Sequence, residues 1–177
     1  MPGVANETPL RDTTAAAFAS SSEHLTEEIR CLDLRLRRQL LALRRRQSPA
    51  DPLAPFKDFV ITDSEAAELL SDSPARDRAG DADVTDDLTS ALSSLQKEIQ
   101  GRVSATLQTG GYLSLARLVD LFHLGRFEVQ CLIVCLAPEL DRKYDRLYGY
   151  LQDDATRRQA GMDLILSLLC ETSAERL

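Results

Sequence analysis

The sequence of 177 residues has no long hydrophobic run. Its longest apolar stretch, Cys131 to Pro138, is far shorter than the ~20 residues that a membrane-spanning helix needs. Its first residues lack the basic segment followed by an apolar one that marks an export signal. We therefore expect a cytoplasmic protein without a membrane segment.

The cysteines are few and form no Cys-x-x-Cys pair. They lie among leucines and valines, which favours reduced, buried thiols over a disulfide framework. His123 together with Cys131 and Cys135 offers atoms that bind zinc, but the sequence supplies no evident fourth ligand. We predict no metal and no other cofactor. The four cysteines are Cys31, Cys131, Cys135 and Cys170.

The motifs of common enzyme sites are also missing. No Gly-x-x-x-x-Gly-Lys-Ser/Thr phosphate loop, Gly-x-Ser-x-Gly or His-Glu-x-x-His pattern occurs in these residues. Asp153-Asp154 followed by Thr156-Arg157-Arg158 has the composition of a metal or phosphate site, but a helix cap with short-range ion pairs explains it more simply. We predict that the chain is not an enzyme.

The chain also lacks an excess of positive charge. Its formal net charge is −7, and residues 51–110 hold 5 basic and 12 acidic groups. This balance disfavours broad electrostatic attraction to nucleic acid or to anionic lipid. The apolar fraction of 44% is nevertheless large enough for a hydrophobic core.

What the sequence does contain is helical periodicity. Apolar residues recur every three or four positions from Leu25 to Leu43 and again from Leu88 to Leu107. The first stripe predicts a long helix that Ser21 or Ser22 caps and that ends by Ser48-Pro49. The second predicts a helix over residues 86–108 that ends at Gly110-Gly111. We expect an all-α fold, a multi-helix bundle in which these two long amphipathic helices form an antiparallel pair.

The organisation into segments follows from composition. We expect a disordered tail over residues 1–20, a long-helix subdomain over 21–110 and a compact helical subdomain over 111–177. Within the second segment, Thr62 and Glu65 have the spacing of a capping box before a short helix. The acidic stretch near residues 72–87 lacks periodicity and is predicted to be a loop.

The C-terminal third is predicted to be a cluster of shorter helices. The first presents Leu115, Leu118, Val119 and Phe122 on one face and ends before Gly125. The next, residues 126–137, is apolar nearly all round, which is typical of a central helix.

Pro138 is expected to end that helix and to begin another, which runs to about Gln152. The spacing of the apolar residues in this last helix places Leu140, Tyr144, Leu147 and Leu151 in the core. Its surface pairs are then Glu139 with Lys143 and Arg142 with Asp145.

A helix, a turn with Gly125 and a second helix also match the outline of a DNA-binding helix-turn-helix. A recognition helix needs exposed polar side chains, whereas the second helix here is rich in valine, leucine and isoleucine. We therefore favour helix packing and keep nucleic-acid binding as an alternative.

Two groups of basic residues are left after the core is assigned, and we interpret them as candidate partner-binding residues. An equally simple interpretation is that the first group only contacts the acidic segment of the same chain. The first group, on the first long helix, is Arg35, Arg37, Arg38, Arg44, Arg45 and Arg46, and the second group is Arg142, Lys143 and Arg146.

The segment from Tyr112 to Cys170 resembles the N-terminal region of a group of large bacterial AAA ATPases, including those encoded with extracellular contractile injection systems. Gln159-Ala160-Gly161 replaces the Arg-Pro-Thr that is usual in that group. The upstream segment "PFKDFVITDSEAAELL" resembles the group more loosely. The matching positions are Phe127-Glu128, Ala137 to Asp141, Tyr144, Arg146 to Tyr148, Tyr150 to Asp154 and Thr156 to Arg158.

The resemblance implies a non-catalytic domain that recruits or positions a protein partner, such as a component of an injection system or another copy of the ATPase. In that group, ATP binding and hydrolysis belong to an ATPase core that follows the matching segment and that these residues do not contain. The alternatives are a helix-turn-helix regulator that binds nucleic acid and a stand-alone structural adaptor.

Overall fold

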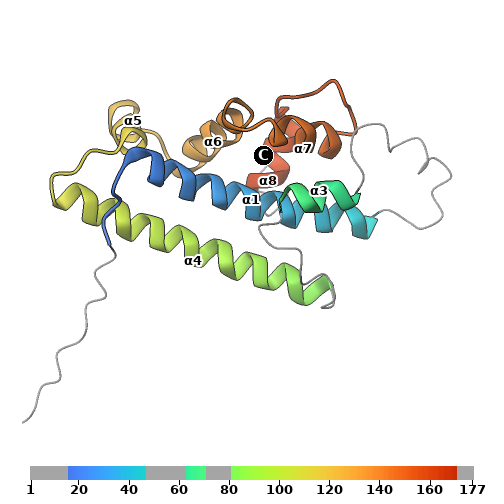
Figure 1. The fold of residues 1–177 in the computed structure, drawn as a ribbon, viewed down its shortest axis with the longest axis horizontal. Coiled ribbons are helices and arrows are strands. Elements are labelled where there is room, and N and C mark those ends of the chain that lie inside the picture. The colour runs from blue at the N-terminus through green and yellow to red at the C-terminus, as the bar shows by residue number, and fades with distance from the viewer. Residues whose placement is uncertain (1–15, 47–62, 71–80, 171–177) are drawn as a thin grey trace, which may run out of the picture.

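The computed structural model describes residues 16–46, 63–70 and 81–170, and the ordered elements in these ranges are helices (Figure 1). No strand occurs in the three ranges, and no helix in them is long and apolar enough to cross a membrane. The expected all-α class, with two long helices and a C-terminal cluster of shorter ones, is confirmed. The helices are α1 (Ser21–Arg46), α3 (Asp63–Leu69), α4 (Asp81–Gln108), α5 (Ser114–Phe122), α6 (Arg126–Leu140), α7 (Lys143–Leu151) and α8 (Met162–Leu169).

The two long helices α1 and α4 form an antiparallel pair, as predicted (Figure 1). At one end of the pair, Nη2 of Arg45 donates a hydrogen bond of 2.9 Å to Oγ1 of Thr85. At the other end, the backbone N–H of Phe18 donates one of 2.8 Å to Oγ1 of Thr106. The predicted end of α4 is also confirmed, because Gly110 has a φ of 78°, a left-handed conformation that favours glycine.

The beginning of α4 differs from the prediction. Residues 81–87, which we expected to be part of an acidic loop, form the first turns of the helix. These turns are rich in aspartate, which interacts favourably with the positive end of a helix dipole. The remainder of the predicted loop, residues 72–80, lies outside the described residues, as do residues 1–15 and the predicted cap at Thr62.

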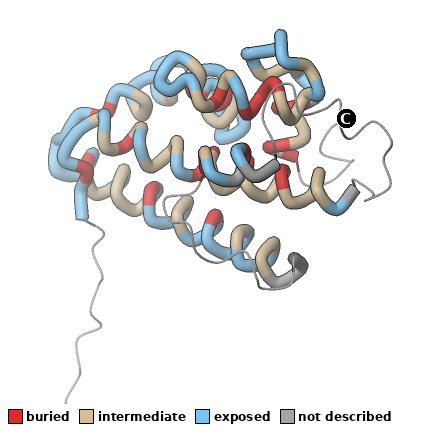
Figure 2. The backbone as a smooth tube through the Cα atoms, turned by 45° about the vertical axis from the view of Figure 1, so that its right-hand side comes forward, coloured by how far each residue is buried: buried red, intermediate tan, exposed pale blue. Residues whose placement is uncertain are grey.

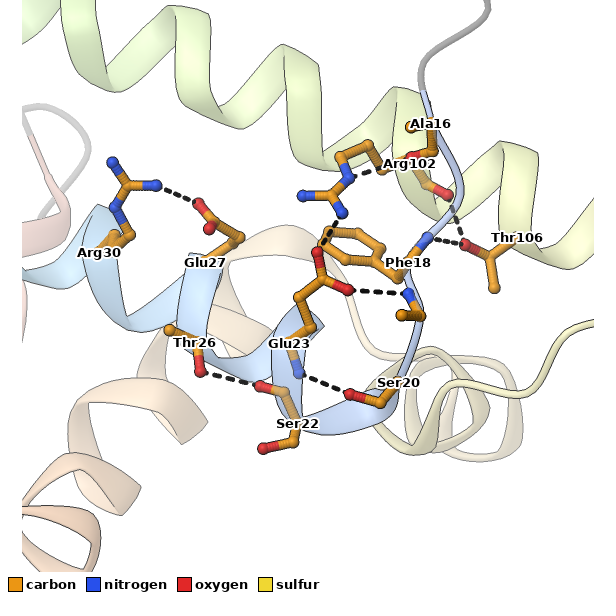
Figure 3. A network of polar contacts seen from close by, with 11 residues as sticks. Ala16, Phe18, Ser20, Ser22, Glu23, Thr26, Glu27, Arg30, Arg102 and Thr106 are labelled. Atoms are coloured by element: carbon orange, nitrogen blue, oxygen red, sulfur yellow. Dashed lines mark hydrogen bonds and ion pairs between the residues drawn. The ribbon is translucent and has the colours of Figure 1, made fainter.

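Residues 16–20 correct the expectation of a disordered tail. They lie along the C-terminal half of α4, and the side chain of Phe18 is buried (Figure 3). The guanidinium of Arg102 lies 4.0 Å from the centre of the Phe18 ring, and its Nε donates a hydrogen bond to the carbonyl oxygen of Ala16. A single aromatic side chain with a cationic partner therefore orders a segment of small residues that has little hydrophobicity of its own.

The N-cap of α1 is one residue earlier than predicted. Oγ of Ser20 accepts a hydrogen bond from the backbone N–H of Glu23, and the Glu23 carboxylate accepts one from the N–H of Ala19 (Figure 3). This reciprocal arrangement resembles a capping box. Ser21 instead contacts the start of α5, because its Oγ accepts a hydrogen bond of 2.9 Å from the N–H of Ser114.

Helix α1 lies between α4 on one side and the shorter helices on the other (Figure 1). Its leucines pack against α3, α6, α7 and α8 in the larger core, and Cys31 joins a smaller core with α4 and residues near α5. Figure 2 shows buried residues along the inner sides of the helices and exposed residues on the outer sides. The larger core includes Leu32, Leu36, Leu40, Val134, Tyr144, Leu147, Tyr148, Leu164 and Leu168, and the smaller one is Phe18, Cys31, Leu92, Ile99 and Leu113.

The prediction that Pro138 ends one helix and begins the next is wrong. Pro138 lies inside α6, which continues to Leu140, and α7 begins at Lys143. Proline has no N–H to donate to the carbonyl oxygen four residues earlier, which is that of Val134. Oη of Tyr148 donates a hydrogen bond of 2.8 Å to this oxygen instead. A side chain from α7 thus replaces the missing backbone donor and allows the helix to continue.

The later helix boundary changes which residues are buried. Leu140 was expected in the core but is 52% exposed, whereas Tyr144 and Leu147 are buried as predicted. Lys143 is not paired with Glu139, because its ammonium forms an ion pair with Asp33 of α1.

Helices α5 and α6 are also more exposed than their composition predicted. Helix α6 buries only Ile133, Val134 and Ala137, so it is not a central helix. Helix α5 has no buried residue, and two of the four residues assigned to its inner face, Leu118 and Phe122, are exposed. The apolar side chains on these helices therefore form surface as well as core.

Candidate functional site

The basic residues predicted on α1 do not form one exposed face. Arg35 is buried, and its Nη1 donates a hydrogen bond of 3.1 Å to the carbonyl oxygen of Leu168 in α8. Arg45 is exposed and bonded to Thr85, as described above. The side chain of Arg46 lies outside the described part of the molecule, and the remaining three arginines, Arg37, Arg38 and Arg44, are half-buried.

The second basic group, Arg142, Lys143 and Arg146, likewise does not form one exposed face. The Lys143 ammonium lies 3.1 Å from the Asp33 carboxylate, and Arg146 lies 3.7 Å from Glu65 of α3. Arg142 is exposed at the start of α7. Several of the predicted partner-binding residues therefore hold the helices of this chain together, and the structure does not bring the two groups into one site.

The Asp33 carboxylate is the centre of one of these contacts. Oη of Tyr144 donates a hydrogen bond of 2.7 Å to Oδ1 of Asp33, while Lys143 contacts the other oxygen. Burial, together with the nearby carboxylate, raises the pKa of Tyr144, so its hydroxyl stays protonated and acts as the donor. Tyr144 and Lys143 thereby fix α7 against α1.

Gln152, at the end of α7, holds the loop that follows it. Nε2 of Gln152 donates hydrogen bonds to the carbonyl oxygens of Tyr148 and Gln159, and its Oε1 accepts one from the N–H of Gly161. These bonds hold the loop between α7 and α8 and set the start of α8 at Met162.

In the acidic pair Asp153-Asp154 of that loop, Asp154 stabilises a turn. Oδ1 of Asp154 accepts hydrogen bonds from the N–H and the hydroxyl of Thr156, which lower the pKa of Asp154. A β-carbon at Gly149 would lie 3.2 Å from the carbonyl oxygen of Asp154, so the close approach of the loop to α7 favours glycine there. The contacts of the segment from Cys135 to Asp154 thus join α6, α7 and the loop before α8.

The cysteines differ in burial, and two of their thiols have a raised pKa. Burial raises the pKa of the Cys31 thiol to about 12, and burial also raises the pKa of Cys131. His123 is exposed in the turn between α5 and α6, with a φ of 53°. Within residues 16–46, 63–70 and 81–170, no group of three or more His, Cys, Asp or Glu side chains has the arrangement of a metal site.

One surface feature of the described residues is a groove between α4 and α5, which we call the α4–α5 groove. It has a volume of about 720 Å³. Along α4 it extends from Gln96 to Leu107, which is three helical turns or roughly 17 Å. Residues of α1 lie in the groove as well, and the first turn of α6 lines one part of it.

The lining of the α4–α5 groove is largely apolar. Val103 and Leu107 of α4 face Leu115 and Val119 of α5 across it, and Leu107 is 51% exposed. Glutamine side chains of α4 and α6 supply uncharged hydrogen-bonding groups. An open apolar groove of this length is the form in which proteins commonly receive a helix of a partner.

His24 of α1 lines the same groove and is 3% exposed. Its ring packs 5.0 Å from the ring of Phe18, and its Nε2 lies 3.7 Å from Oε1 of Glu28. Its Nδ1 has no hydrogen-bond partner among the described residues. A buried polar atom without a partner is uncommon in folded proteins and is often found at functional sites.

Exposed hydrophobic side chains continue from the α4–α5 groove over α5 and the turn that follows it. Leu118, Leu121 and Phe122 of α5 and Phe127 of α6 are between 42% and 63% exposed. Clusters of exposed apolar side chains of this kind mark surfaces that bind other molecules. The α4–α5 groove and these neighbours are the candidate functional site.

Sequence reasoning missed this site because it assigned apolar residues to the core. The composition of α5 and α6 could have indicated the site. These helices carry apolar residues on more faces than the neighbouring helices cover. In a chain of this size, an excess of this kind indicates either a central helix or an exposed binding surface, and periodicity alone does not separate the two.

Among the residues that the structure describes, all elements are helices, and α5, a three-residue turn and α6 form a helix-turn-helix outline beside an apolar groove. The chain matches the family described as "Winged helix domain, variant" over residues 7–177, and it belongs to that family. No curated protein and no solved structure matches the chain significantly.

Proposed function

We propose that this chain is a non-catalytic protein-interaction module that binds a helical segment of a partner in the α4–α5 groove. The observation that carries the proposal is the groove itself, which is apolar, open and three turns long, beside a helix α5 that buries none of its residues. Filling the groove with a partner helix would remove Leu107, Leu115 and Val119 from water, a change that favours binding by roughly 25 cal/mol per Å² of apolar surface.

The more specific role that we propose is the one implied by the resemblance to the N-terminal region of AAA ATPases. In that role the module recruits or positions a protein for a remodelling ATPase, and its partner is a component of an injection system or another copy of the ATPase. Membership of the winged-helix variant family supports a regulatory or binding role and leaves the class of partner open.

Nucleic-acid binding is the second candidate, and the family description favours it. In a helix-turn-helix, side chains near the start of the second helix contact bases and phosphates. In α6 the exposed residues at the start are Arg126, Phe127 and Glu128. One cation beside a carboxylate and an aromatic ring, in a chain with a net charge of −7, gives a weak basis for contact with phosphates. We therefore favour a protein partner.

A comparison of two variants tests the proposal. Leu107→Arg places a charge in the α4–α5 groove at a position that is already 51% exposed, so it should leave the fold intact. Ser94→Arg adds the same charge at an exposed position of α4 that does not line the groove. Proteins retained by the immobilised wild-type chain from its native host are identified, and the purified partner is titrated by calorimetry.

We expect Leu107→Arg to weaken binding of that partner at least tenfold and Ser94→Arg to leave it unchanged. Equal binding by all three chains would place the interface elsewhere, with Arg142 and the half-buried arginines of α1 as the next candidates. Retention of DNA that decreases steeply with added salt would instead support the nucleic-acid candidate.

A further inference from the structure

His24 is the part of the α4–α5 groove that apolar contacts with a partner helix do not explain. Its side chain lines the groove and is almost fully buried, yet Nδ1 has no hydrogen-bond partner among the described residues. A buried nitrogen without a partner has lost its hydrogen bond to water and has gained none in exchange, which costs free energy. The groove therefore combines apolar walls with one polar group that a bound molecule can satisfy.

The surroundings of the ring indicate which kind of group is missing. Nε2 of His24 lies 3.7 Å from Oε1 of Glu28, one turn farther along α1. The charge of this carboxylate favours the neutral ring with its proton on Nε2, because the N–H dipole then points toward the charge. Nδ1 is then a hydrogen-bond acceptor. The ring of Phe18, whose centre lies 5.0 Å from that of the His24 ring, has no O–H or N–H that could donate to it.

The charges around the groove oppose a bound group that only accepts hydrogen bonds. The carboxylates of Glu28 and Asp120 both line the groove, and Asp120 forms an ion pair of 2.8 Å with Arg117. Arg126, at the start of α6, also lines the groove but is exposed. A carboxylate placed against Nδ1 would meet a lone pair and the like charge of Glu28 beyond the ring. A donor avoids both conflicts.

We propose that the helix bound in the α4–α5 groove carries one side-chain hydrogen-bond donor on its otherwise apolar side, and that this donor bonds to Nδ1 of His24. The inference rests on the proposed function, because it names a property of the partner helix that the groove receives. His24 is then the residue that determines specificity. Apolar contacts with Val103, Leu107 and Val119 accept many amphipathic helices, whereas a buried acceptor penalises every helix that leaves it unpaired.

The first measurement is made on the purified chain alone. Nitrogen-15 NMR reports which ring nitrogen of a histidine carries the proton, and His123→Asn assigns the signals because the chain has two histidines. We expect His24 at neutral pH to carry its proton on Nε2 and none on Nδ1. A proton on Nδ1, in a neutral or a charged ring, would overturn the proposal, because the ring would then need an acceptor.

The second measurement identifies the helices that the groove accepts. A displayed library of amphipathic helical peptides, randomised along the apolar side, is selected on the wild-type chain, and peptides that Leu107→Arg also retains are discarded. We expect the remaining peptides to share a serine, threonine, asparagine, glutamine or lysine at one position among apolar residues. Selected peptides that are apolar at every position of this side, or that carry a carboxylate there, would contradict the proposal.

The hydrogen bond itself is measured by a double-mutant cycle. A selected peptide, and the same peptide with alanine in place of the donor, are titrated by calorimetry into the wild type and into His24→Phe. Replacing the donor should weaken binding to the wild type about tenfold and should change binding to His24→Phe by less than about threefold. His24→Asn keeps an acceptor close to the position of Nδ1 and should retain part of the preference for the donor. Circular dichroism verifies that each variant is folded, and the NMR measurement needs neither of them.

The failure of this inference and the failure of the proposed function give different results. An equal preference for the donor in the wild type and in His24→Phe would overturn the role of His24 and would leave the groove as a site that binds helices. A selection in which no peptide distinguishes the wild type from Leu107→Arg would overturn both.

Discussion

At the scale of single residues, the contact between Tyr148 and the carbonyl oxygen of Val134 explains a proline within a helix. Pro138 cannot donate to that oxygen, and the Tyr148 hydroxyl does so at 2.8 Å. Burial raises the pKa of Tyr148, which keeps the donor protonated.

The first prediction concerns this pair of residues. Tyr148→Phe should lower the free energy of unfolding by about 1–2 kcal/mol, because it leaves a buried carbonyl oxygen without a donor. Pro138→Ala restores a backbone N–H that can reach the same oxygen. Alone it should change the free energy of unfolding little, and in the double variant it should recover part of the stability that Tyr148→Phe loses. Denaturant unfolding of the wild type, the two single variants and the double variant gives the coupling free energy between the two positions, and strictly additive changes would contradict the proposed contact.

A second prediction at this scale concerns Glu23. The hydrogen bond from Arg102, and then that from the N–H of Ala19, lower the pKa of Glu23 from its ordinary value of 4.5. A carboxylate with a lowered pKa adds stability above its pKa in the unfolded chain, and this stability is lost as the pH falls through its pKa in the folded chain. Glu23→Gln should therefore reduce the melting temperature at pH 7 and should differ little from the wild type well below pH 4.5.

Melting curves of the wild type and Glu23→Gln at both pH values provide this measurement. Glu27→Gln is a suitable control, because Glu27 forms an ion pair with the exposed Arg30 one turn away, a contact that adds little to stability. A difference between wild type and Glu23→Gln that stays constant from pH 7 to pH 3 would show that the carboxylate has no special role at the N-terminus of α1.

At the scale of the elements, the sequence predicted the long helices well because each has one apolar stripe and a clear stop, such as Gly110 after α4. It failed at Pro138, where the compensating donor comes from Tyr148 in the next helix and local rules do not include it. It also failed for α6, because a helix that is apolar all round has the same pattern whether its outer face is buried or exposed.

A third prediction tests the revised helix phase. Leu140 and Leu147 would share one core face if a single helix began at Pro138, but Leu147 is fully buried and Leu140 is 52% exposed. Leu147→Asp should lower the free energy of unfolding by about 4 kcal/mol or more, since it buries an unpaired charge. Leu140→Asp should change it by less than about 1 kcal/mol, and thermal melts with equal losses would contradict these helix boundaries.

At the scale of the whole molecule, the class of fold was accessible from the sequence and the candidate site was not. The basic residues of α1 were predicted to bind a partner because they remained after core assignment, yet Arg35 is buried against α8. The α4–α5 groove is lined by residues of α1 as well as by the consecutive helices α4, α5 and α6, and the packing of α4 and α5 against α1 brings these residues together.

The fourth prediction is that the purified 177-residue chain neither binds nor hydrolyses ATP. No phosphate-loop motif occurs in the sequence, so it lacks both the backbone N–H groups that hold phosphates and the Ser or Thr that binds magnesium in that motif. Calorimetric titration with magnesium-ATP is the test. Saturable binding in the micromolar range would contradict the assignment of a non-catalytic role.

The most direct test of partner binding in the α4–α5 groove is photo-crosslinking in the native host. A photoreactive amino acid replaces Ser104, which is exposed and lines the α4–α5 groove, or Ser94, which is exposed on α4 outside it. The account predicts a discrete protein adduct from position 104, insensitive to nuclease and absent from position 94. Adducts that nuclease removes, or the same protein adducts from both positions, would contradict the claim that this groove receives a protein partner.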